Sequence, residues 1–354
     1  MSRFLTERLS ALKPYVPGEQ PKERKFIKLN TNESPFPPSK MAIKLAQEEA
    51  DKLMLYPDPD CTNLLKAVAE DLSVKTENVI LTNGSDEVLN FAFMAYCDND
   101  TPAVFADITY GFYKVFADIN CLPKNVIPLK DDFSISIDDY LSFKGTIFIA
   151  NPNAPTGLLL GLDEIERLLK ADKNRMVVID EAYIDFGGQS AVTLIDKYDN
   201  LLVTRTFSKS RSMAGARLGF GVANKSVIED LNRIKYSTNP YNVNRMTAAA
   251  GVGSILDKDY FTQNVNKIIA NRDYTVKNLK AMGFDVTNSY ANFVFARHDK
   301  IDGNTLYLKL KENGILVRHF TDDKIKDYNR ITIGSLEEMQ TFIATVKHIL
   351  GSIV

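Results

Sequence analysis

Five short segments of the chain carry side chains that could do chemistry, and each follows a short apolar stretch. Together they contain a lysine, carboxylates, tyrosines, hydroxyls and an arginine. An amine, acids and phenolic hydroxyls gathered in one place could bind a ligand and move protons on it. The segments are NGSDE (83–87), DITYGFY (107–113), NPNAPTG (151–157), DEAYIDF (180–186) and TFSKSRSMAGARLG (206–219).

The elements that must position these segments alternate between short strands and helices. Strands that are apolar on both sides, separated by helices, predict an α/β fold with a largely parallel sheet covered on both faces. Ligands of such sheets bind beyond the carboxyl ends of the strands, where all five segments lie. We expect strands at 79–81, 103–105, 146–150, 176–179 and 201–203, and helices at 87–96, 112–118 and 163–170.

The rest of the chain predicts an arm before this unit and a smaller unit after it. Prolines discourage regular structure in residues 1–39, which we interpret as an arm. We expect a large domain at 40–259 and a small C-terminal α+β domain at 260–354. Further helices are expected at 40–54, 64–72, 245–256, 261–282, 305–312 and 336–350, and further strands at 284–286, 293–295, 315–317 and 331–333.

Composition excludes several classes of protein. The 354 residues, 45% of them hydrophobic, suffice for two domains. A net charge of -2 gives no surplus with which to hold nucleic acid. Cys61, Cys97 and Cys121 are widely separated and lack metal-ligand spacing, so we expect a reducing compartment and no metal. Without a signal peptide or a membrane-length apolar run, we expect a cytoplasmic protein.

The order and location of the five segments resemble those of the fold type I pyridoxal-phosphate (PLP) enzymes, in the class II aminotransferase family. Within it the chain is similar to the histidinol-phosphate aminotransferases. Taken alone, a Ser-Lys pair usually marks a solvated lysine. Further matching segments are KPYVPG (13–18), KLNTNESPFPPS (28–39), YPDP (56–59), VR (317–318) and NRITIGSLEE (329–338). The resemblance implies PLP as the cofactor and a large domain with a mostly parallel sheet plus a smaller C-terminal domain.

The resemblance implies three catalytic residues. Lys209 matches the lysine that carries the cofactor aldehyde and then acts as general base. Asp180 resembles the carboxylate that keeps the pyridine nitrogen protonated, although it could instead cap a helix. Tyr183 would hydrogen-bond the phenolic oxygen of the cofactor, and Tyr110 would stack on the pyridine ring.

The cofactor phosphate requires several convergent donors. The start of the 87–96 helix would supply backbone N–H groups and the positive end of the helix dipole. The carboxylate of Asp86 is better interpreted as capping that helix. An arginine eight residues after Lys209 could form a bidentate pair with the phosphate. The residues implied are Gly84, Ser85, Asp86, Thr206, Ser208 and Arg217.

The chain departs from the family pattern at Ala154. The family usually has an asparagine immediately before Pro-Thr-Gly, and its amide bonds the phenolic oxygen. Two alternatives stay open: Asn153 takes over this contact, or Tyr183 acts alone.

The resemblance also implies an anion site for the substrate. Arg330 resembles the arginine that grips a carboxylate or, in histidinol phosphate, the phosphate in its place. Arg318, Tyr15 and Asn32 match positions around the same anion, with Asn292 in a supporting role. The alternatives for Arg318 and Tyr15 are surface charge and packing of the arm.

Tyr56 resembles a tyrosine that reaches the cofactor phosphate of a neighbouring subunit, which implies a homodimer with shared active sites. The implied reaction transfers an amino group between L-histidinol phosphate and 2-oxoglutarate. The alternatives are an aromatic amino-acid aminotransferase, a threonine-phosphate decarboxylase and, among non-enzymes, a PLP-sensing binding module. The absence of a basic DNA-binding extension counts against the last.

Overall fold

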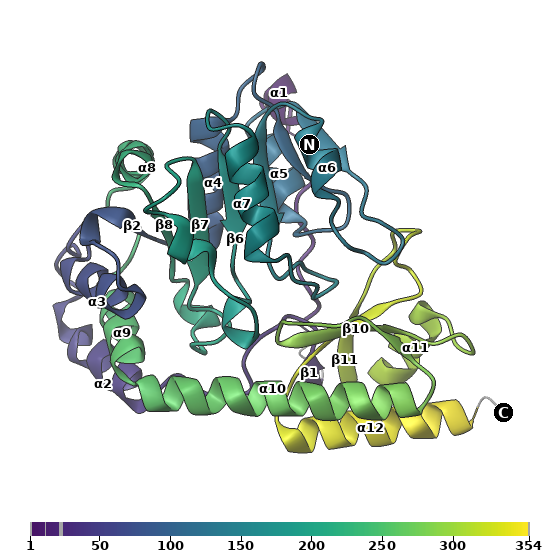
Figure 1. The fold of residues 1–354 in the computed structure, drawn as a ribbon. Helices are drawn as coiled ribbons and strands as arrows, with labels where there is room; N and C mark the ends of the chain where they lie inside the picture. The colour runs from purple at the N-terminus through teal and green to yellow at the C-terminus, as the bar shows by residue number, and fades with distance from the viewer. Residues whose placement is uncertain (1, 11, 21–23, 353–354) are drawn as a thin grey trace.

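Two β-sheets organise the molecule, seen at the upper left and lower right of Figure 1. This computed structural model describes residues 2–10, 12–20 and 24–352. The long helix α10 (Lys258–Ala281) runs along the base of the molecule, from the helices beside the larger sheet to the smaller sheet (Figure 1). No helix among the described residues is both long enough and apolar enough to cross a bilayer.

The larger sheet has seven strands in the order β2-β8-β7-β6-β5-β3-β4. Every strand is parallel to the others except β8, which is antiparallel to both of its neighbours. The predicted parallel sheet is therefore confirmed. Its strands are β2 (Val79–Thr82), β3 (Ala103–Ala106), β4 (Lys124–Ile127), β5 (Thr146–Ala150), β6 (Val177–Asp180), β7 (Leu201–Thr206) and β8 (Gly219–Ala223).

Both faces of this sheet are buried. Successive side chains of a strand point to opposite faces, so on β5 Ile147 and Ile149 enter one hydrophobic cluster while Phe148 enters the other. The helices around it are α2 (Lys40–Glu48), α3 (Thr62–Leu72), α4 (Ser85–Tyr96), α5 (Phe112–Ile119), α6 (Ile137–Leu141), α7 (Leu162–Ala171), α8 (Lys225–Thr238) and α9 (Arg245–Leu256). Short 3-10 helices lie at Ala50–Lys52, Thr76–Asn78, Ile184–Phe186, Ala191–Leu194 and Ala214–Ala216.

The smaller sheet has five strands in the order β1-β11-β12-β10-β9 and a hydrophobic cluster of its own. A capping box between Ser335 and Glu338 begins α12, which packs beside α10. We propose the division into domains 40–259 and 260–354 because the two sheets have largely separate cores. The elements are β9 (Asp285–Val286), β10 (Phe293–Arg297), α11 (Gly303–Glu312), β11 (Ile315–His319), β12 (Asn329–Thr332) and α12 (Leu336–Gly351).

The expectation that residues 1–39 lack regular structure is wrong in part. A short helix α1 (Glu7–Ser10) precedes β1 (Ile27–Leu29), which pairs in parallel with β11. This pairing is possible because residues 24–34 contain no proline, so their backbone N–H groups can join a sheet. The arm therefore supplies an edge strand of the smaller sheet, and it brings Thr31 and Glu33 close to the carboxyl ends of strands in the larger sheet.

Strands β4 and β8 and helices α6 and α8 were not expected from the sequence. The β8 strand includes Gly219 and Gly221, a residue type depleted in strands, and it is stabilised by pairing on both sides. Helix α8 is strongly polar, and Asn224 caps its first turn by accepting a bond from Ser226 N.

Candidate active site

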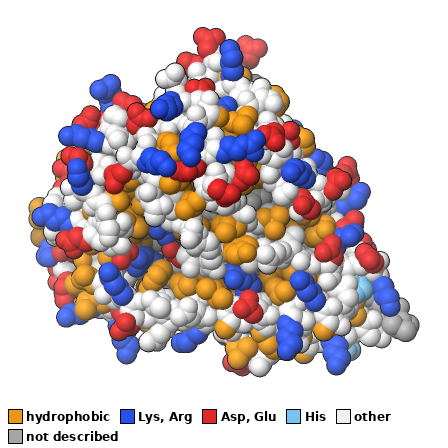
Figure 2. All heavy atoms as spheres, viewed as in Figure 1, with side chains coloured by type: hydrophobic (Ala, Val, Ile, Leu, Met, Phe, Trp, Pro, Cys, Tyr) orange, Lys and Arg blue, Asp and Glu red, His pale blue; other side chains and the backbone are white. Residues whose placement is uncertain are grey.

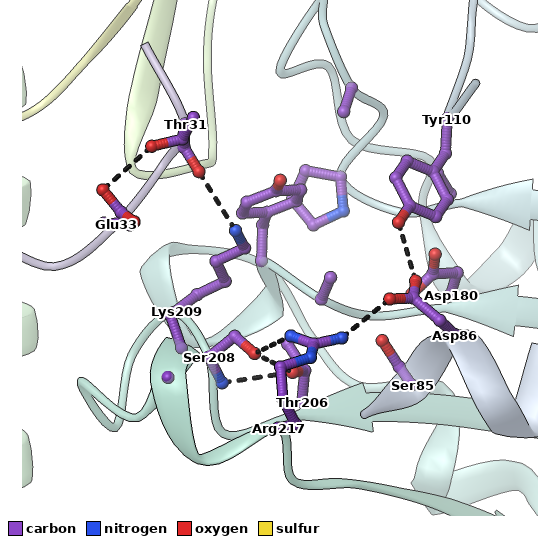
Figure 3. Close-up of a pocket in the computed structure, with 17 residues that line it drawn as sticks. Thr31, Glu33, Ser85, Asp86, Tyr110, Asp180, Thr206, Ser208, Lys209 and Arg217 are labelled. Carbon is purple, nitrogen blue, oxygen red and sulfur yellow. Dashed lines mark hydrogen bonds and ion pairs between the residues drawn. The ribbon is translucent and has the colours of Figure 1, made fainter. Parts of the chain in front are cut away.

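The carboxyl ends of β5, β6 and β7, together with the start of α4, surround a cavity of about 310 Å³, the cofactor cavity (Figure 3). Nine of the twelve residues predicted to bind or act with a cofactor line it; the exceptions are Gly84, Asn153 and Tyr56. The nine are Ser85, Asp86, Tyr110, Asp180, Tyr183, Thr206, Ser208, Lys209 and Arg217. The role of each residue is still a prediction, but the structure shows that all nine line the same cavity.

Lys209 extends from the loop after β7 into this cavity. Its Nζ atom donates to the backbone oxygen of Thr31 at 3.3 Å and lies 5.8 Å from the centre of the Tyr183 ring (Figure 3). Burial, followed by the nearby positive charge of Arg330, lowers the pKa of Lys209 to about 8. The amine is thus far closer to its neutral, nucleophilic form at pH 7 than an exposed lysine would be.

Asp180 ends strand β6 and is only 4% exposed. Its carboxylate accepts hydrogen bonds from Thr204 Oγ1 at 3.1 Å and from the Tyr113 hydroxyl at 3.2 Å. Burial dominates over these two bonds and raises the pKa of Asp180 to about 6. A cationic ring nitrogen beside this carboxylate would favour its charged form, because opposite charges attract strongly when water is excluded.

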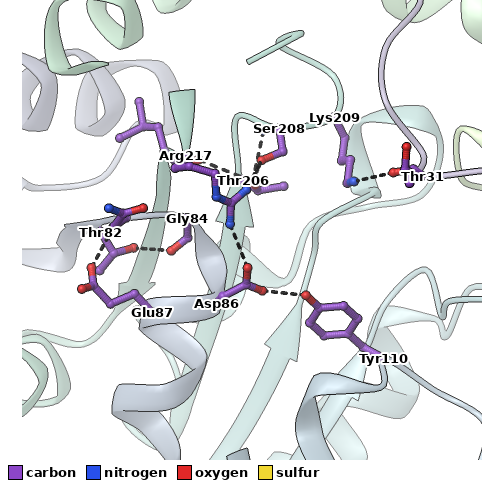
Figure 4. A network of polar contacts seen from close by, with 12 residues as sticks. Thr31, Thr82, Gly84, Asp86, Glu87, Tyr110, Thr206, Ser208, Lys209 and Arg217 are labelled. Carbon is purple, nitrogen blue, oxygen red and sulfur yellow. Dashed lines mark hydrogen bonds and ion pairs between the residues drawn. The ribbon is translucent and has the colours of Figure 1, made fainter. Parts of the chain in front are cut away.

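Asp86 does not cap α4, so that interpretation is wrong. The cap residue is Gly84, and Asp86 lies in the first turn with its carboxylate turned toward the cavity. There it accepts from the Tyr110 hydroxyl at 2.7 Å and pairs with Arg217 Nη2 at 2.8 Å (Figure 4). Asp86 therefore holds Tyr110 and Arg217 in place, while Glu87 bonds the backbone N–H of Asn83.

Gly84 matters for its lack of a side chain. Its φ of +77° is in the region that favours glycine, and a Cβ atom there would lie 2.6 Å from Arg217 Nη2. Glycine at this position therefore lets the guanidinium lie against the start of α4. Arg217 Nη1 also lies 3.4 Å from Ser208 Oγ. A cation, hydroxyl groups and the N-terminus of α4 are therefore close together (Figure 4).

These groups fit pyridoxal phosphate. The hydroxyls of Ser85, Thr206 and Ser208 line one end of the cavity with Arg217, as a phosphate requires. A buried carboxylate and an amine of lowered pKa complete the set, and they match the ring nitrogen and the aldehyde. No group of three or more potential metal ligands occurs in the described part of the chain.

Asn153 does not face the cavity. Its amide donates to Ile108 O at 3.0 Å and to Thr156 Oγ1 at 3.1 Å, and its oxygen accepts from Thr109. Ala154 lines the cavity instead. Of the two alternatives left open by the sequence, this geometry supports the one in which Tyr183 acts without Asn153.

A second cavity of about 350 Å³, the anion cavity, adjoins the first. All four residues predicted to bind substrate line it, namely Tyr15, Asn32, Arg318 and Arg330. The two cavities share Thr31, Tyr110, Ala154, Tyr183 and Lys209. A molecule in the anion cavity would therefore contact the same lysine that enters the cofactor cavity.

Arg318 and Arg330 face each other on adjacent antiparallel strands, β11 and β12. Neither forms an ion pair with any carboxylate of the described residues. Arg330 Nη2 donates to Asn30 O at 3.0 Å, while its buried Nε atom has no partner among those residues. Two like charges directly across a ladder destabilise a sheet, so this pair suits a bound anion.

The remaining predicted residues have different surroundings. Tyr15 stacks on Phe112, with ring centroids 4.4 Å apart. Asn32 lines the anion cavity, but its amide nitrogen bonds the Tyr183 hydroxyl, and Asn292 donates to the backbone oxygen of Asn32. Tyr56 is 78% exposed and lines neither cavity.

Sequence reasoning missed Tyr113 and Thr204, the two donors to Asp180. Both are completely buried. Tyr113 lies in the DITYGFY segment after β3, and Thr204 directly follows the apolar residues 201–203 that were expected as a strand. A buried hydroxyl needs a partner, so these positions carried a usable signal.

Comparison with known proteins identifies the family. The model of the family described as aminotransferase class I and II matches residues 24–346. The histidinol-phosphate aminotransferase of Brachyspira hyodysenteriae is 50% identical over 352 residues, 99% of each chain. That of Clostridium acetobutylicum is 46% identical over 352 residues, 99% of this chain and all of the relative.

Solved structures agree with this assignment. A histidinol-phosphate aminotransferase structure from Clostridium acetobutylicum is 25% identical and covers 92% of this chain and 99% of its own, with a TM-score of 0.86. One from Sinorhizobium meliloti, in complex with pyridoxal-5'-phosphate, is 21% identical and shares the fold, with a TM-score of 0.90 over 100% of this chain and 99% of its own.

The chain belongs to the class I and II aminotransferases, and its fold is that of the fold type I PLP enzymes. It is an aminotransferase that uses pyridoxal phosphate and acts on small molecules. Its full-length relatives at 45–50% identity are histidinol-phosphate aminotransferases.

Proposed function

We propose that this cytoplasmic aminotransferase moves the amino group between L-histidinol phosphate and 2-oxoglutarate, with the cofactor on Lys209. The observation that carries the proposal is the pair Arg318 and Arg330, which form no ion pair with a carboxylate of the described residues and lie in a cavity that reaches Lys209. A phosphate dianion offers more acceptor oxygens than a carboxylate, so it can use both guanidinium groups and the Tyr15 hydroxyl.

The names of the full-length relatives support the same substrate. An α-carboxylate, such as that of glutamate, could bind Arg330 alone. Arg330 therefore carries little information on the substrate, whereas a second arginine directly opposite it does. Arg330 has a buried Nε atom without a partner among the described residues, and Arg318 donates only to the backbone oxygen of Val16, so a ligand with enough acceptors can use both guanidinium groups.

Each residue of the cofactor cavity has a task in this proposal. Pyridoxal phosphate, when bound, supplies a ring that accepts electrons from the reacting carbon. Lys209, once its amine is free, would take the proton from the reacting carbon of the substrate and deliver it to the carbon of the cofactor that had carried the aldehyde. Asp180 would hold a proton on the ring nitrogen, and Tyr183 would donate to the phenolic oxygen.

A half-reaction assay tests the proposed substrate. The purified holoenzyme is mixed with one amino donor at a time, without an acceptor, and the loss of the lysine-bound cofactor absorbance is followed. For each donor the assay gives the ratio of the rate constant to Kd. We expect this ratio to be highest for histidinol phosphate and lower for phenylalanine. A preference for phenylalanine would replace the proposal with an aromatic aminotransferase, and release of carbon dioxide from threonine phosphate would indicate a decarboxylase.

We also propose a homodimer in which Tyr56 contributes to the neighbouring active site. Tyr56 stacks on Tyr241, with centroids 4.7 Å apart, beside the strongly exposed Leu53, Met54 and Leu55. Figure 2 shows hydrophobic side chains gathered in the lower half of the face in view, near α10, while charged side chains crowd the upper half. The exposed apolar side chains of residues 53–56 suit a subunit interface.

Mixing two inactive variants tests the shared site. Tyr56→Ala and Lys209→Ala are each purified, unfolded together and refolded as a mixture. If Tyr56 serves the partner, a mixed dimer has one intact site and activity returns above that of either variant. If Tyr56 serves its own subunit, the mixture stays as inactive as its components.

A further inference from the structure

The Tyr183 hydroxyl has a single hydrogen-bond partner among the described residues, the side chain of Asn32. Asn32 Nδ2 lies 2.9 Å from the Tyr183 oxygen, and the two residues are 151 positions apart in the sequence. Asn32 is 1% exposed, so its amide is a buried polar group. It contacts Tyr183, a tyrosine that lies beside Lys209 and lines both cavities.

The surrounding bonds fix which end of the Asn32 amide faces Tyr183. Thr332 Oγ1 accepts the backbone N–H of Asn32 at 2.9 Å, and the same hydroxyl lies 3.1 Å from Asn32 Oδ1. With the amide oxygen toward Thr332, the hydroxyl accepts from the backbone N–H and donates to Oδ1; with the amide turned over, the Thr332 proton would have no acceptor among the described residues. The amide oxygen therefore faces Thr332, and the amide nitrogen faces Tyr183.

This orientation leaves the Tyr183 proton free. A phenol has one proton to donate and can accept through its lone pairs, and Asn32 occupies a lone pair. The described residues provide no acceptor for the proton, while Tyr183 lines both cavities. Burial raises the pKa of Tyr183, so the hydroxyl keeps its proton over the working pH range.

The neighbouring loop does not supply an amide to the cavity. Asn151 exchanges bonds with the backbone of Leu160, and Asn153 is occupied by Ile108 and Thr156. Ala154, which lines both cavities, has no polar side-chain atom. Among the loop residues 151–157 and Tyr183, Tyr183 is therefore the one with a side-chain proton free to point into the cofactor cavity. With no second donor from this loop, the direction of the Tyr183 O–H bond decides whether the phenolic oxygen receives a hydrogen bond.

The backbone of Asn32 is held in place for this contact. Its φ of +55° lies in the left-handed region, which asparagine tolerates better than most residues. Thr332 and Asn292 both bond its backbone groups, the latter through Nδ2 to the Asn32 oxygen at 3.1 Å. A conformation fixed by several contacts keeps the amide in one position.

We propose that Asn32 is a positioning residue: by donating to the Tyr183 oxygen, it aims the Tyr183 proton at the phenolic oxygen of the cofactor. The inference rests on the proposed function, in which the cofactor is joined to Lys209 beside Tyr183. It gives Asn32 a task other than the substrate contact expected from the sequence.

A pH titration of the holoenzyme absorbance tests this role without measuring activity. A bond donated to the phenolic oxygen favours the deprotonated form of the lysine-bound cofactor, in which that oxygen is most negative. Tyr183→Phe should therefore raise the midpoint by about one pH unit, the size expected for one hydrogen bond. Asn32→Gly, which suits a positive φ, should raise it by a smaller amount.

Two further variants separate positioning from other effects. Asn32→Asp keeps the shape of the side chain but would accept the Tyr183 proton, so it should raise the midpoint at least as much as Tyr183→Phe. When Tyr183→Phe is already present, adding Asn32→Gly should not shift the titration midpoint further. Adding Asn32→Asp to Tyr183→Phe measures how much the negative charge alone shifts the midpoint. Asn329→Ala is the matched control, because this buried asparagine of β12 bonds Gly303 and lines neither cavity.

Each result has one meaning. An unchanged midpoint in Tyr183→Phe would show that Tyr183 does not donate to the phenolic oxygen as the proposed function requires. The inference about Asn32 would then fail as well. A shift in Tyr183→Phe with none in either Asn32 variant would overturn the inference alone. So would an Asn32→Gly shift that persists undiminished without the Tyr183 hydroxyl.

Discussion

The two adjoining cavities differ in whether their arginines are paired with carboxylates. In the cofactor cavity the cation Arg217 is paired with Asp86, and the polar groups stand mainly at strand ends of one rigid sheet. In the anion cavity Arg318 and Arg330 have no carboxylate partner among the described residues, and the walls come from the arm, the smaller sheet and the larger sheet. A site for a resident group can balance its own charges, whereas a site for exchanging anions must keep its positive charge available.

The largest expected effect falls where the two cavities meet, at Lys209. Lys209→Ala should lower turnover by roughly 10³-fold or more, because it removes both the attachment amine and the general base. Reduction of the wild-type holoenzyme with borohydride, followed by peptide mapping, should place the cofactor label on Lys209. Lys197→Ala, which removes an exposed partner of Glu166, is the control and should be fully active. A label on another lysine would contradict the assignment.

Asp180→Asn should change only the cofactor cavity. Turnover should fall by about 10²-fold while the cofactor stays bound, since an amide cannot hold the ring nitrogen protonated. The apoenzyme should melt at a higher temperature than wild type at pH 7. In the wild type the pKa of Asp180, about 6, lies above its unfolded value. At pH 7 the folded protein therefore loses stability by burying a charged carboxylate, and a neutral amide avoids this cost. Near-normal turnover would make Asp180 a structural residue.

Variants of the opposed arginines should separate the two substrates. Arg330→Leu should weaken both half-reactions, and Arg318→Leu should reduce kcat/KM about 5- to 150-fold for histidinol phosphate but little for glutamate. Arg297→Leu removes an exposed, ion-paired arginine from β10 of the same sheet and should affect neither substrate. Equal losses for both substrates in Arg318→Leu would argue against a phosphate in the anion cavity.

The smallest expected effect is a shift in pH dependence that links the cavities. Apoenzyme should bind pyridoxal phosphate covalently at a rate that rises with pH through about 8, since only neutral Lys209 attacks the aldehyde. Arg330→Leu removes a positive neighbour that disfavours the protonated amine, so the midpoint should move to higher pH. Stopped-flow absorbance measures both midpoints, and identical values would show that the cavities are electrostatically independent.

The sequence by itself predicted the parallel sheet and nine of the residues that line the cofactor cavity. Short apolar strands have a period and length that can be read directly, and the sheet then places every strand-end segment at one edge. The resemblance to the fold type I PLP enzymes then singled out Lys209, Asp180 and Arg217 within those segments, and all three line one cavity with Ser85. The four residues predicted around the substrate anion also line one cavity.

Only the tertiary structure decided how those side chains pair. The sequence suggested Asp86 as a helix cap and left Asn153 as one of two alternatives for the contact with the phenolic oxygen. In the structure Asp86 bonds Tyr110 and Arg217, and Asn153 bonds its own loop and Ile108. The contact between Asn32 and Tyr183 depends on β1 joining the smaller sheet. Local patterns determine which element a residue enters, but a hydrogen bond depends on the direction of two side chains, which only packing between distant segments fixes.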